Sequence, residues 1–401
     1  MTNRRVLPNR NARKIFGMIR KSGTVSKQDL LNASGLTSST LTRTLAELID
    51  LKAIREVGYG SSTGGRKPIL YRINPQFGYT FGLDISRTHV MLILYDMSLA
   101  KKASRRWIMD ETLTPDRLFD ELTKAVNEML AECGVCSADL LGLGIGAVGP
   151  LDRDSGIILT PPMFPARGWE HVVIGPTLEK TLGLPVILDN GANTALWGEY
   201  WHSSVDRYRH LLYVHAGIGI RTAMIADGKL MYGAVDMEGA VGQMVIRAER
   251  NLHGTGGASW ESCVSLHALL RRVERRLQVG GDSALAERAK GRHADLTYSD
   301  LLHALKEQDS LVVEAFRETA VYFGIGLANL LNILHPEKVI LGGPVFSDNV
   351  LFFRIATQTA IKNTYHYPAY QVVFAGCRLG EEAVAYGAAI MVIDMLEKER
   401  F

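Results

Sequence analysis

The residues with the clearest potential for chemistry follow an apolar run at 186–188, where Asp189, Asn190 and Gly191 precede a helical pattern. This order predicts a strand, a tight loop and a helix N-terminus. In open α/β folds, ligands bind at the carboxyl ends of strands, where helix amides point toward the ligand. We therefore expect Asp189 and Asn190 to face a cleft. For Asn190, a helix cap is an equally good interpretation on local grounds.

The elements that position this loop are alternating strands and helices over residues 78–401. Buried apolar runs at 141–145, 211–215 and 339–341 each end in a glycine-containing segment, and helical patterns such as 312–334 fill the gaps. Strands that alternate with helices, with small residues at the strand ends, indicate an α/β body with nucleotide-type loops.

The first 80 residues differ from this body in charge. They carry 14 Lys and Arg against 4 Asp and Glu, a net charge of +10, whereas the whole chain of 401 residues is only +3 and the remainder is therefore −7. A basic segment on an acidic body indicates that this segment meets a polyanion.

The same segment has the pattern of a winged helix-turn-helix. Ser26 is placed to cap a short helix, Gly35 makes the turn, and a third helix follows at about 38–51. Its exposed face is suited to base edges and phosphates, and the residues there are Ser38, Ser39, Thr40, Thr42 and Arg43.

Two short segments at 54–57 and 69–73, joined by a Gly/Ser/Thr-rich stretch, predict a hairpin whose tip carries Arg66 and Lys67. These cations can reach phosphates or enter a minor groove. The alternative is a small helical protein-interaction domain with a solvated basic face.

Composition places limits on the compartment. No apolar run approaches the roughly 18 residues of a membrane span, and no signal peptide is visible behind the first methionine, so we expect a cytoplasmic protein without membrane association. Four cysteines are present, and Cys133 and Cys136 form a Cys-x-x-Cys. A redox pair or half a zinc site is possible for them, but two ordinary thiols near a helix end are favoured, since no second pair completes a tetrahedral set.

Taken together, the short segments resemble the ROK family of repressors, open reading frames and sugar kinases, and the resemblance covers nearly the whole chain. The segments that carry it are the wing tip at 63–68, Gly142-Leu143-Gly144-Ile145-Gly146-Ala147-Val148-Gly149-Pro150, the Asp189-Asn190 loop, Ala226-Asp227-Gly228-Lys229-Leu230 and Gly342-Gly343.

The resemblance implies a fold and a domain order. The fold is an N-terminal winged helix-turn-helix (α with a small β wing) followed by a two-lobed α/β body of the actin-like ATPase, sugar-kinase-like class. The domains would be a DNA-binding domain at 1–76, a first α/β lobe at 78–190 plus about 376–401, and a second α/β lobe with a dimerisation surface at 191–375.

Departures from the kinase pattern argue against catalysis. Family kinases carry an Asp-x-Gly-Gly-Thr phosphate loop, and the matching segment here is 84–88, where Arg87 stands in place of a glycine that lets backbone amides approach phosphates. In the sugar loop, kinases have Asn-Asp, whose Asp is the general base. Here Gly191 follows Asn190, so we expect no catalytic residue.

The resemblance also assigns effector binding to Asn190, Gln243 and Glu261. The family's Gly-Glu-x-Gly-His segment is matched by 239–243, in which Ala240 replaces a sugar-binding Glu and Gln243 replaces a His that contacts sugar and structural zinc. Glu261 matches the family's second sugar-binding Glu, and its alternative is a solvated charge on a helix face.

The zinc-binding cysteines of the family are missing from this chain. His253 is the only evident ligand in the matching segment at 252–261, and a tetrahedral site needs a full ligand set. We therefore predict no metal, and we expect no cofactor.

The favoured function is a sequence-specific DNA-binding regulator of carbohydrate genes, most simply a repressor. Its partners would be operator DNA, a sugar or sugar-derivative effector, and a second copy in a homodimer or dimer of dimers. One alternative is an active sugar kinase with an appended DNA-binding module. Another is a scaffold with neither activity.

Overall fold

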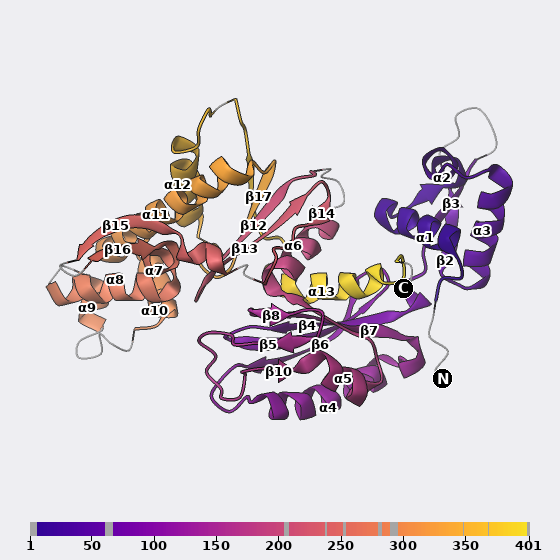
Figure 1. Ribbon diagram of the computed structural model, residues 1–401, viewed down its shortest axis with the longest axis horizontal. Coiled ribbons are helices and arrows are strands. Elements are labelled where there is room, and N and C mark those ends of the chain that lie inside the picture. Colours follow the sequence, from indigo (N-terminus) through magenta and orange to yellow (C-terminus); the bar gives the residue numbers. More distant parts are fainter. Residues whose placement is uncertain are drawn as a thin grey trace. The chain divides into compact units, whose positions relative to one another are not determined.

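The computed structural model describes residues 6–60, 67–203, 208–236, 239–251, 254–279, 283–288, 296–347, 349–367 and 369–398. The chain divides into two compact units (Figure 1). Unit 1 comprises Met1–Arg207 and Glu382–Phe401, and unit 2 comprises Tyr208–Glu381. The three domain ranges expected from the sequence remain predictions.

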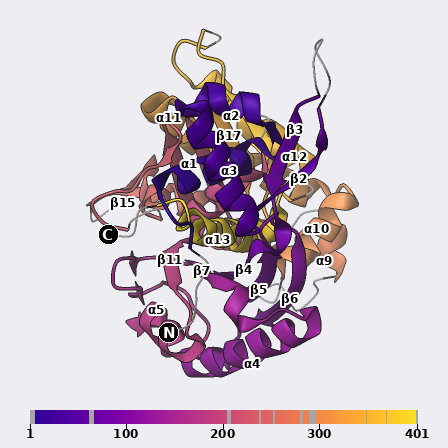
Figure 2. The ribbon, with the colours of Figure 1, turned by 90° about the vertical axis from the view of Figure 1, so that its right-hand side faces the viewer.

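Unit 1 begins with three helices and a small antiparallel sheet, which lie together in Figure 2. The elements are α1 (Arg10–Ser22), β1 (Val25–Ser26), α2 (Lys27–Ser34), α3 (Ser38–Asp50), β2 (Ile54–Tyr59) and β3 (Ile69–Ile73), with sheet order β1-β3-β2. Local chemistry sets the helix starts: Ser26 caps α2 in a capping box with Asp29, and Thr37 caps α3. The cap expected at Ser26 is confirmed.

A five-stranded sheet forms the centre of unit 1, in the order β11-β7-β4-β5-β6. Its strands are β4 (Tyr79–Ile85), β5 (His89–Asp96), β6 (Lys101–Ile108), β7 (Leu140–Ala147) and β11 (Val186–Asn190). Strands β11, β7 and β4 run parallel, and β5 and β6 are antiparallel additions. The sheet therefore ends at Asn190 on one edge, directly before a helix.

Helices cover both faces of this sheet because the strand side chains alternate. On one face, Leu92 and Leu94 join a core that includes residues of α4 (Pro115–Cys133) and α5 (Ile174–Leu182). On the other, Met91 and Ile93 pack against α13 (Ala383–Asp394), beside which lies α6 (Gly191–His202). Figure 1 shows these two layers. The remaining short elements of unit 1 are η1 (Pro75–Phe77), η2 (Ser137–Asp139) and the strands β8 (Leu151–Asp152), β9 (Ile157–Ile158) and β10 (Val172–Val173).

Helix α13 lies unusually close to its neighbours. Gly82 in β4 and Gly144 in β7 are register partners, and a Cβ on either would stand 1.9 Å from a carbonyl oxygen of α13. Within α13, a Cβ on Gly387 would stand 1.7 Å from the carbonyl oxygen of Thr194 in α6. Backbone therefore meets backbone at these points, and no side chain larger than hydrogen fits.

Unit 2 contains a second five-stranded sheet, in the order β14-β13-β12-β17-β18. The strands are β12 (Leu211–Ala216), β13 (Ile220–Ala226), β14 (Lys229–Leu230), β17 (Lys338–Gly342) and β18 (Val373–Gly376), and a separate hairpin pairs β15 (Val245–Asn251) with β16 (Gly254–Ser259). Gly343, which follows β17, has a positive φ of 93°, and a Cβ on it would stand 2.3 Å from the carbonyl oxygen of Ala216 at the end of β12.

Helices surround the sheet of unit 2. They are η3 (Ala240–Gln243), α7 (Trp260–Val264), α8 (Leu266–Val279), α9 (Ala284–Arg288), α10 (Tyr298–Lys306), α11 (Ser310–Leu334) and α12 (Val350–Lys362), and η5 (Gly380–Glu382) adjoins α13. The core of this unit contains Trp260 of α7 and Phe323 of α11, whose ring centroids lie 5.1 Å apart. Among the described residues, no helix is long and apolar enough to cross a membrane.

The close approach of α13 generates a stability prediction. Gly387→Ala should lower the free energy of unfolding by about 1–3 kcal/mol, the usual cost of overpacking a tight core. Gly376→Ala is the matched control, because a Cβ there meets nothing within 4 Å. Urea unfolding of both variants tests this, and an unchanged midpoint for Gly387→Ala would contradict the backbone contact.

Candidate effector and nucleic-acid sites

The third helix presents most of the residues expected to read DNA. Ser38, Ser39, Thr42 and Arg43 are exposed, and Thr40 is half-buried. The Arg43 side chain is 84% exposed and forms an ion pair with Glu47 one turn later at 3.1 Å. The first turn of α3 therefore offers hydroxyls and one cation on its outer face.

Three of these hydroxyls have local partners, and that of Ser39 lies 3.2 Å from Thr37 Oγ1. Thr42 Oγ1 donates to the Ser38 carbonyl and accepts from Lys27 Nζ, at 2.7 Å each. Thr40 Oγ1 lies 2.8 Å from Thr37 Oγ1 within the cap of α3. These contacts hold the side chains in place at the start of α3.

At the hairpin, Lys67 is exposed at the start of the segment that enters β3. Arg66 lies outside the described residues. DNA contact by either residue stays a prediction.

The loop at 189–191 is built as the end of a strand and the start of a helix. Asn190 is the N-cap of α6, and its Oδ1 accepts the backbone N–H of Ala192 at 3.0 Å. Gly191 is the first residue of α6 and is buried. Since the Asn190 oxygen caps the helix, the capping interpretation is confirmed, and effector binding by this side chain stays a prediction.

Asp189 is turned toward the start of α6. Its Oδ1 accepts from the Asn190 backbone N–H at 2.7 Å and from Asn193 Nδ2 at 2.9 Å. The same oxygen lies 3.9 Å from Arg153 Nη1, and Asp189 is only 4% exposed. A carboxylate with these partners serves the loop and is poorly placed to replace the missing base at 191.

The segment that matches the kinase phosphate loop is also internally paired. Asp84 is buried at the end of β4, with its Oδ2 3.3 Å from Nε2 of His89. The other ring nitrogen of His89 lies 3.1 Å from Ser86 Oγ. Arg87 Nε donates to the Pro162 carbonyl at 2.9 Å. The one carboxylate of this loop thus faces an imidazole, and the arginine is bound to the neighbouring loop.

In unit 2, Glu261 lies in the first turn of α7, and its Oε2 accepts the backbone N–H of Ile220 at 2.8 Å. Gly242 of η3 packs beside the same oxygen, since a Cβ there would lie 3.1 Å away. The adjacent Gln243 is exposed. Two of the three predicted effector residues are therefore in neighbouring elements, with Glu261 linking the start of β13 to α7.

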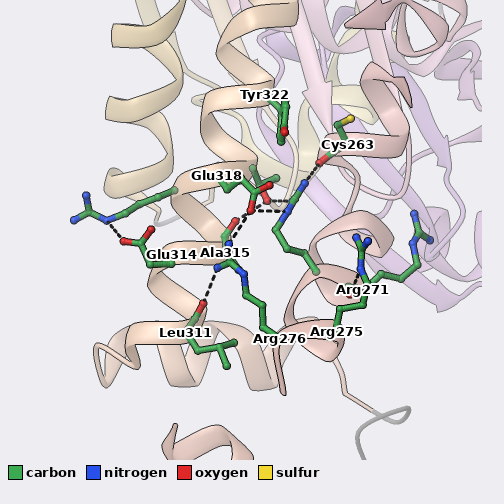
Figure 3. A network of polar contacts seen from close by, with 12 residues as sticks. Cys263, Arg271, Arg275, Arg276, Leu311, Glu314, Ala315, Glu318 and Tyr322 are labelled. Carbon is green, nitrogen blue, oxygen red and sulfur yellow. Dashed lines mark hydrogen bonds and ion pairs between the residues drawn. The ribbon is translucent and has the colours of Figure 1, made fainter. Parts of the chain in front are cut away.

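A buried arginine of α8 contacts α7. Figure 3 shows the surrounding polar network, in which Cys263, Arg276 and Glu318 are labelled. Arg272 of α8 donates to the Cys263 carbonyl of α7 at 3.2 Å and also bonds Thr319 Oγ1 of α11. Glu318 lies 3.3 Å from Arg272 Nε and 2.7 Å from Arg276 Nη2. Burial lowers the pKa of Arg272, and Glu318 opposes that shift. The cluster fixes the helix that carries Glu261.

A metal site was not expected, and its absence stays a prediction. Within the described ranges, no group of three His, Cys, Asp or Glu side chains is arranged to hold a metal ion. His253 lies outside the described residues. Cys133, Cys136, Cys263 and Cys377 are free thiols.

Sequence reasoning missed the contacts that join distant segments. Arg20 of α1 forms ion pairs with Asp394 and Glu397 near the end of the chain. No spacing or local pattern reports such pairs. The structure shows that the Arg20 side chain is only 7% exposed, a burial that the sequence pattern of its helix does not indicate.

The two five-stranded sheets, with helices packed around each, have the actin-like sugar-kinase fold. The ROK family profile matches residues 80–395. The chain belongs to the ROK family.

Individual relatives include both branches of this family. The chain is 28% identical to a xylose repressor of Caldicellulosiruptor bescii over 99% of this chain and 98% of that one. A ROK family transcriptional regulator, described as a homologue of the E. coli MLC protein, superposes with a TM-score of 0.79 at 21% identity, covering 97% of this chain and 96% of its own.

A ROK glucokinase from Streptomyces griseus, in complex with glucose and AMPPNP, superposes with a TM-score of 0.65 at 24% identity. It covers 79% of this chain and 100% of its own. The kinase-like fold thus accounts for the body, and the family match starts only at residue 80.

Restoring the missing base alone should not restore phosphoryl transfer. In Gly191→Asp, Asp84 would still face His89 and Arg87 would still replace a glycine of the phosphate loop. We expect no sugar-dependent ATP turnover from this variant or from the wild type, against about 1–100 per second for a working kinase. A coupled ATP assay over a panel of hexoses and pentoses measures this. Turnover in Gly191→Asp would show that the base was the only defect.

Proposed function

We propose that this protein is a sugar-responsive DNA-binding transcriptional repressor that lacks kinase activity. The observation that carries the proposal is the similarity to a xylose repressor over 99% of the chain, the N-terminal helices included. We propose D-xylose as the first effector to test, and genes of sugar metabolism as the regulated genes.

The N-terminal segment acts as the winged helix-turn-helix. Its third helix enters the major groove with Ser38, Ser39 and Arg43 toward the bases and phosphates, and the β2–β3 hairpin contacts the backbone with Arg66 and Lys67. A homodimer would place two such modules on a pseudo-palindromic operator, because protein and site then share a two-fold axis.

The body acts as the sensor. Gln243 and Glu261 of unit 2, and Asn190 of unit 1, are the side chains proposed to bind sugar hydroxyls. A sugar that binds the DNA-free conformation more tightly shifts the population away from the operator. The rival function, an active sugar kinase, has the glucokinase likeness of the body in its favour, and the inward pairing of Asp84 and Asp189 argues against it.

Footprinting of the promoter regions of sugar genes with the full chain tests the proposal. We expect a protected pseudo-palindrome that millimolar D-xylose releases and that D-glucose leaves bound. Glu261→Gln keeps an acceptor for the Ile220 N–H but removes the charge. It should raise the xylose concentration for half-release about tenfold, since a hydrogen bond to a charged group is worth about 1.5–3 kcal/mol. Absence of any protected fragment would contradict the DNA-binding function.

Contact between the β2–β3 hairpin and DNA phosphates should appear in the salt dependence of operator affinity. Arg66→Ala combined with Lys67→Ala should weaken operator binding and reduce the steepness of log affinity against log salt by about 2, one unit for each lost phosphate contact. Lys124→Ala is the matched control, since Lys124 is an exposed cation on α4, 72% exposed. An unchanged salt slope in the double variant would show that the hairpin does not touch DNA.

A further inference from the structure

A buried cation joins the N-terminal helices of unit 1 to its body. Arg20, in the last turn of α1, contacts Asp394 Oδ1 through Nη2 and Glu397 Oε1 through Nε, the latter at 2.5 Å. Its guanidinium carbon lies 4.0 Å from the ring centroid of Trp201 in α6. One arginine of the DNA-facing segment thus contacts α6, the end of α13 and the residues beyond it.

The carboxylate of Asp394 is shared between this arginine and α6. Its second oxygen, Oδ2, accepts Trp197 Nε1 at 2.8 Å. Trp197 in turn stacks on Tyr200, with ring centroids 5.3 Å apart. We call Arg20, Trp197, Trp201, Asp394 and Glu397 the Arg20 latch.

Helix α6 connects the latch to the loop at 189–191. It starts at Gly191, directly after Asn190, and reaches Trp201 within about 15 Å at 1.5 Å per residue. Its backbone is pressed against α13 at Gly387. A close-packed contact of this kind resists sliding or separation, so a displacement at Asn190 moves both helices and the carboxylate of Asp394 with them.

The N-terminal helices are packed on the same end of unit 1. Phe16 of α1 and Phe77 lie in one core with Met97 and Ile393, the residue before Asp394. A Cβ on Gly17 would stand 2.6 Å from Glu397 Oε2, so α1 lies directly on the end of the chain. The DNA-facing helices therefore cannot keep their position if the end of α13 moves.

Several charged groups meet at the latch. Two carboxylates face Arg20, Lys21 Nζ lies 5.9 Å from the Trp201 ring, and Arg13 and Lys14 line a pocket with Glu397. Burial raises the pKa of the Glu397 carboxyl, and Arg20 beside it opposes that shift. Removing Arg20 would take the cationic partner from two partly buried carboxylates and leave Asp394 with the Trp197 N–H, which is costly.

We propose that the Arg20 latch transmits the state of the 189–191 loop to the DNA-facing helices, with Arg20 as a positioning residue that touches neither sugar nor DNA. The inference rests on the proposed function, because it names how the sugar signal reaches the operator-binding segment. The competing interpretation is that the Arg20 latch only stabilises the packing of α1 on unit 1 and transmits no signal.

The experiment compares the operator affinity of the full chain with and without D-xylose for several variants. In the wild type we expect a ratio of affinities of about 5–150, the usual range of allosteric coupling, and in Arg20→Ala a ratio below about 2. Trp197→Phe keeps an aromatic ring beside Tyr200 but removes the indole N–H that donates to Asp394, together with the pyrrole part of the ring. It should lower the ratio without unfolding the chain. Arg105→Ala is the matched control: it breaks an ion pair between Arg105 of β6 and Glu132 of α4, neither of which belongs to the latch, and should keep the wild-type ratio.

Hydrogen exchange supplies a readout that does not depend on the identity of the sugar. Linkage is reciprocal, so operator DNA must change the exchange of residues 197–203 in the wild type if the latch transmits a signal. This change should disappear in Arg20→Ala and Trp197→Phe. If D-xylose does not alter operator binding by the wild type, D-xylose is not the effector. The hydrogen-exchange result then decides whether the Arg20 latch transmits a signal.

Two results would overturn the latch while leaving the repressor function intact. One is a wild-type sugar response in both Arg20→Ala and Trp197→Phe. The other is exchange at 197–203 that is unaffected by operator DNA in the wild type. Failure of the wild type to bind any promoter fragment would overturn the latch and the proposed function together.

Discussion

The contact on which unit 1 depends is the approach of one helix backbone to a sheet. Gly82 and Gly144 are partners on neighbouring strands, and together they leave a strip of the sheet without side chains, which we call the glycine track. Helix α13 lies against it. Gly387 likewise lets the backbone of α13 contact the backbone of α6. At these points, dispersion between backbone atoms takes the place of the usual packing of interdigitated side chains. The direction of α6, the position of Asp394 and the seat of the N-terminal helices all follow from this packing.

Much of the fold was predictable because its causes are local. The caps at Ser26 and Thr37, the strand and helix around Asn190 and the glycine-rich strand ends all depend on residues a few positions apart. The contacts of the predicted site were harder to predict from the sequence. The ion pair of Arg20 with Asp394 spans 374 positions and the orientation of Asp189 depends on Asn193 and Arg153, so neither follows from residue type and spacing.

Both acidic residues at the kinase-like loops are held by partners within the protein. Asp84 faces His89, and Asp189 accepts from Asn193, so each carboxylate has acquired a protein partner at a strand end. A buried carboxylate without a partner would be costly. Internal pairing thus satisfies each carboxylate within the protein and holds it at the end of its strand.

The discontinuity of unit 1 has a consequence for biosynthesis. Residues 1–207 of this unit are completed only by 382–401, with the whole of unit 2 inserted between them. On the ribosome, the glycine track of β4 and β7 therefore stays uncovered until α13 emerges, while the inserted unit can already fold around its own core. A chain interrupted before α13 would expose an apolar sheet face, which chaperones and proteases recognise. Residues 382–401 are therefore needed to complete the packing of residues 1–207.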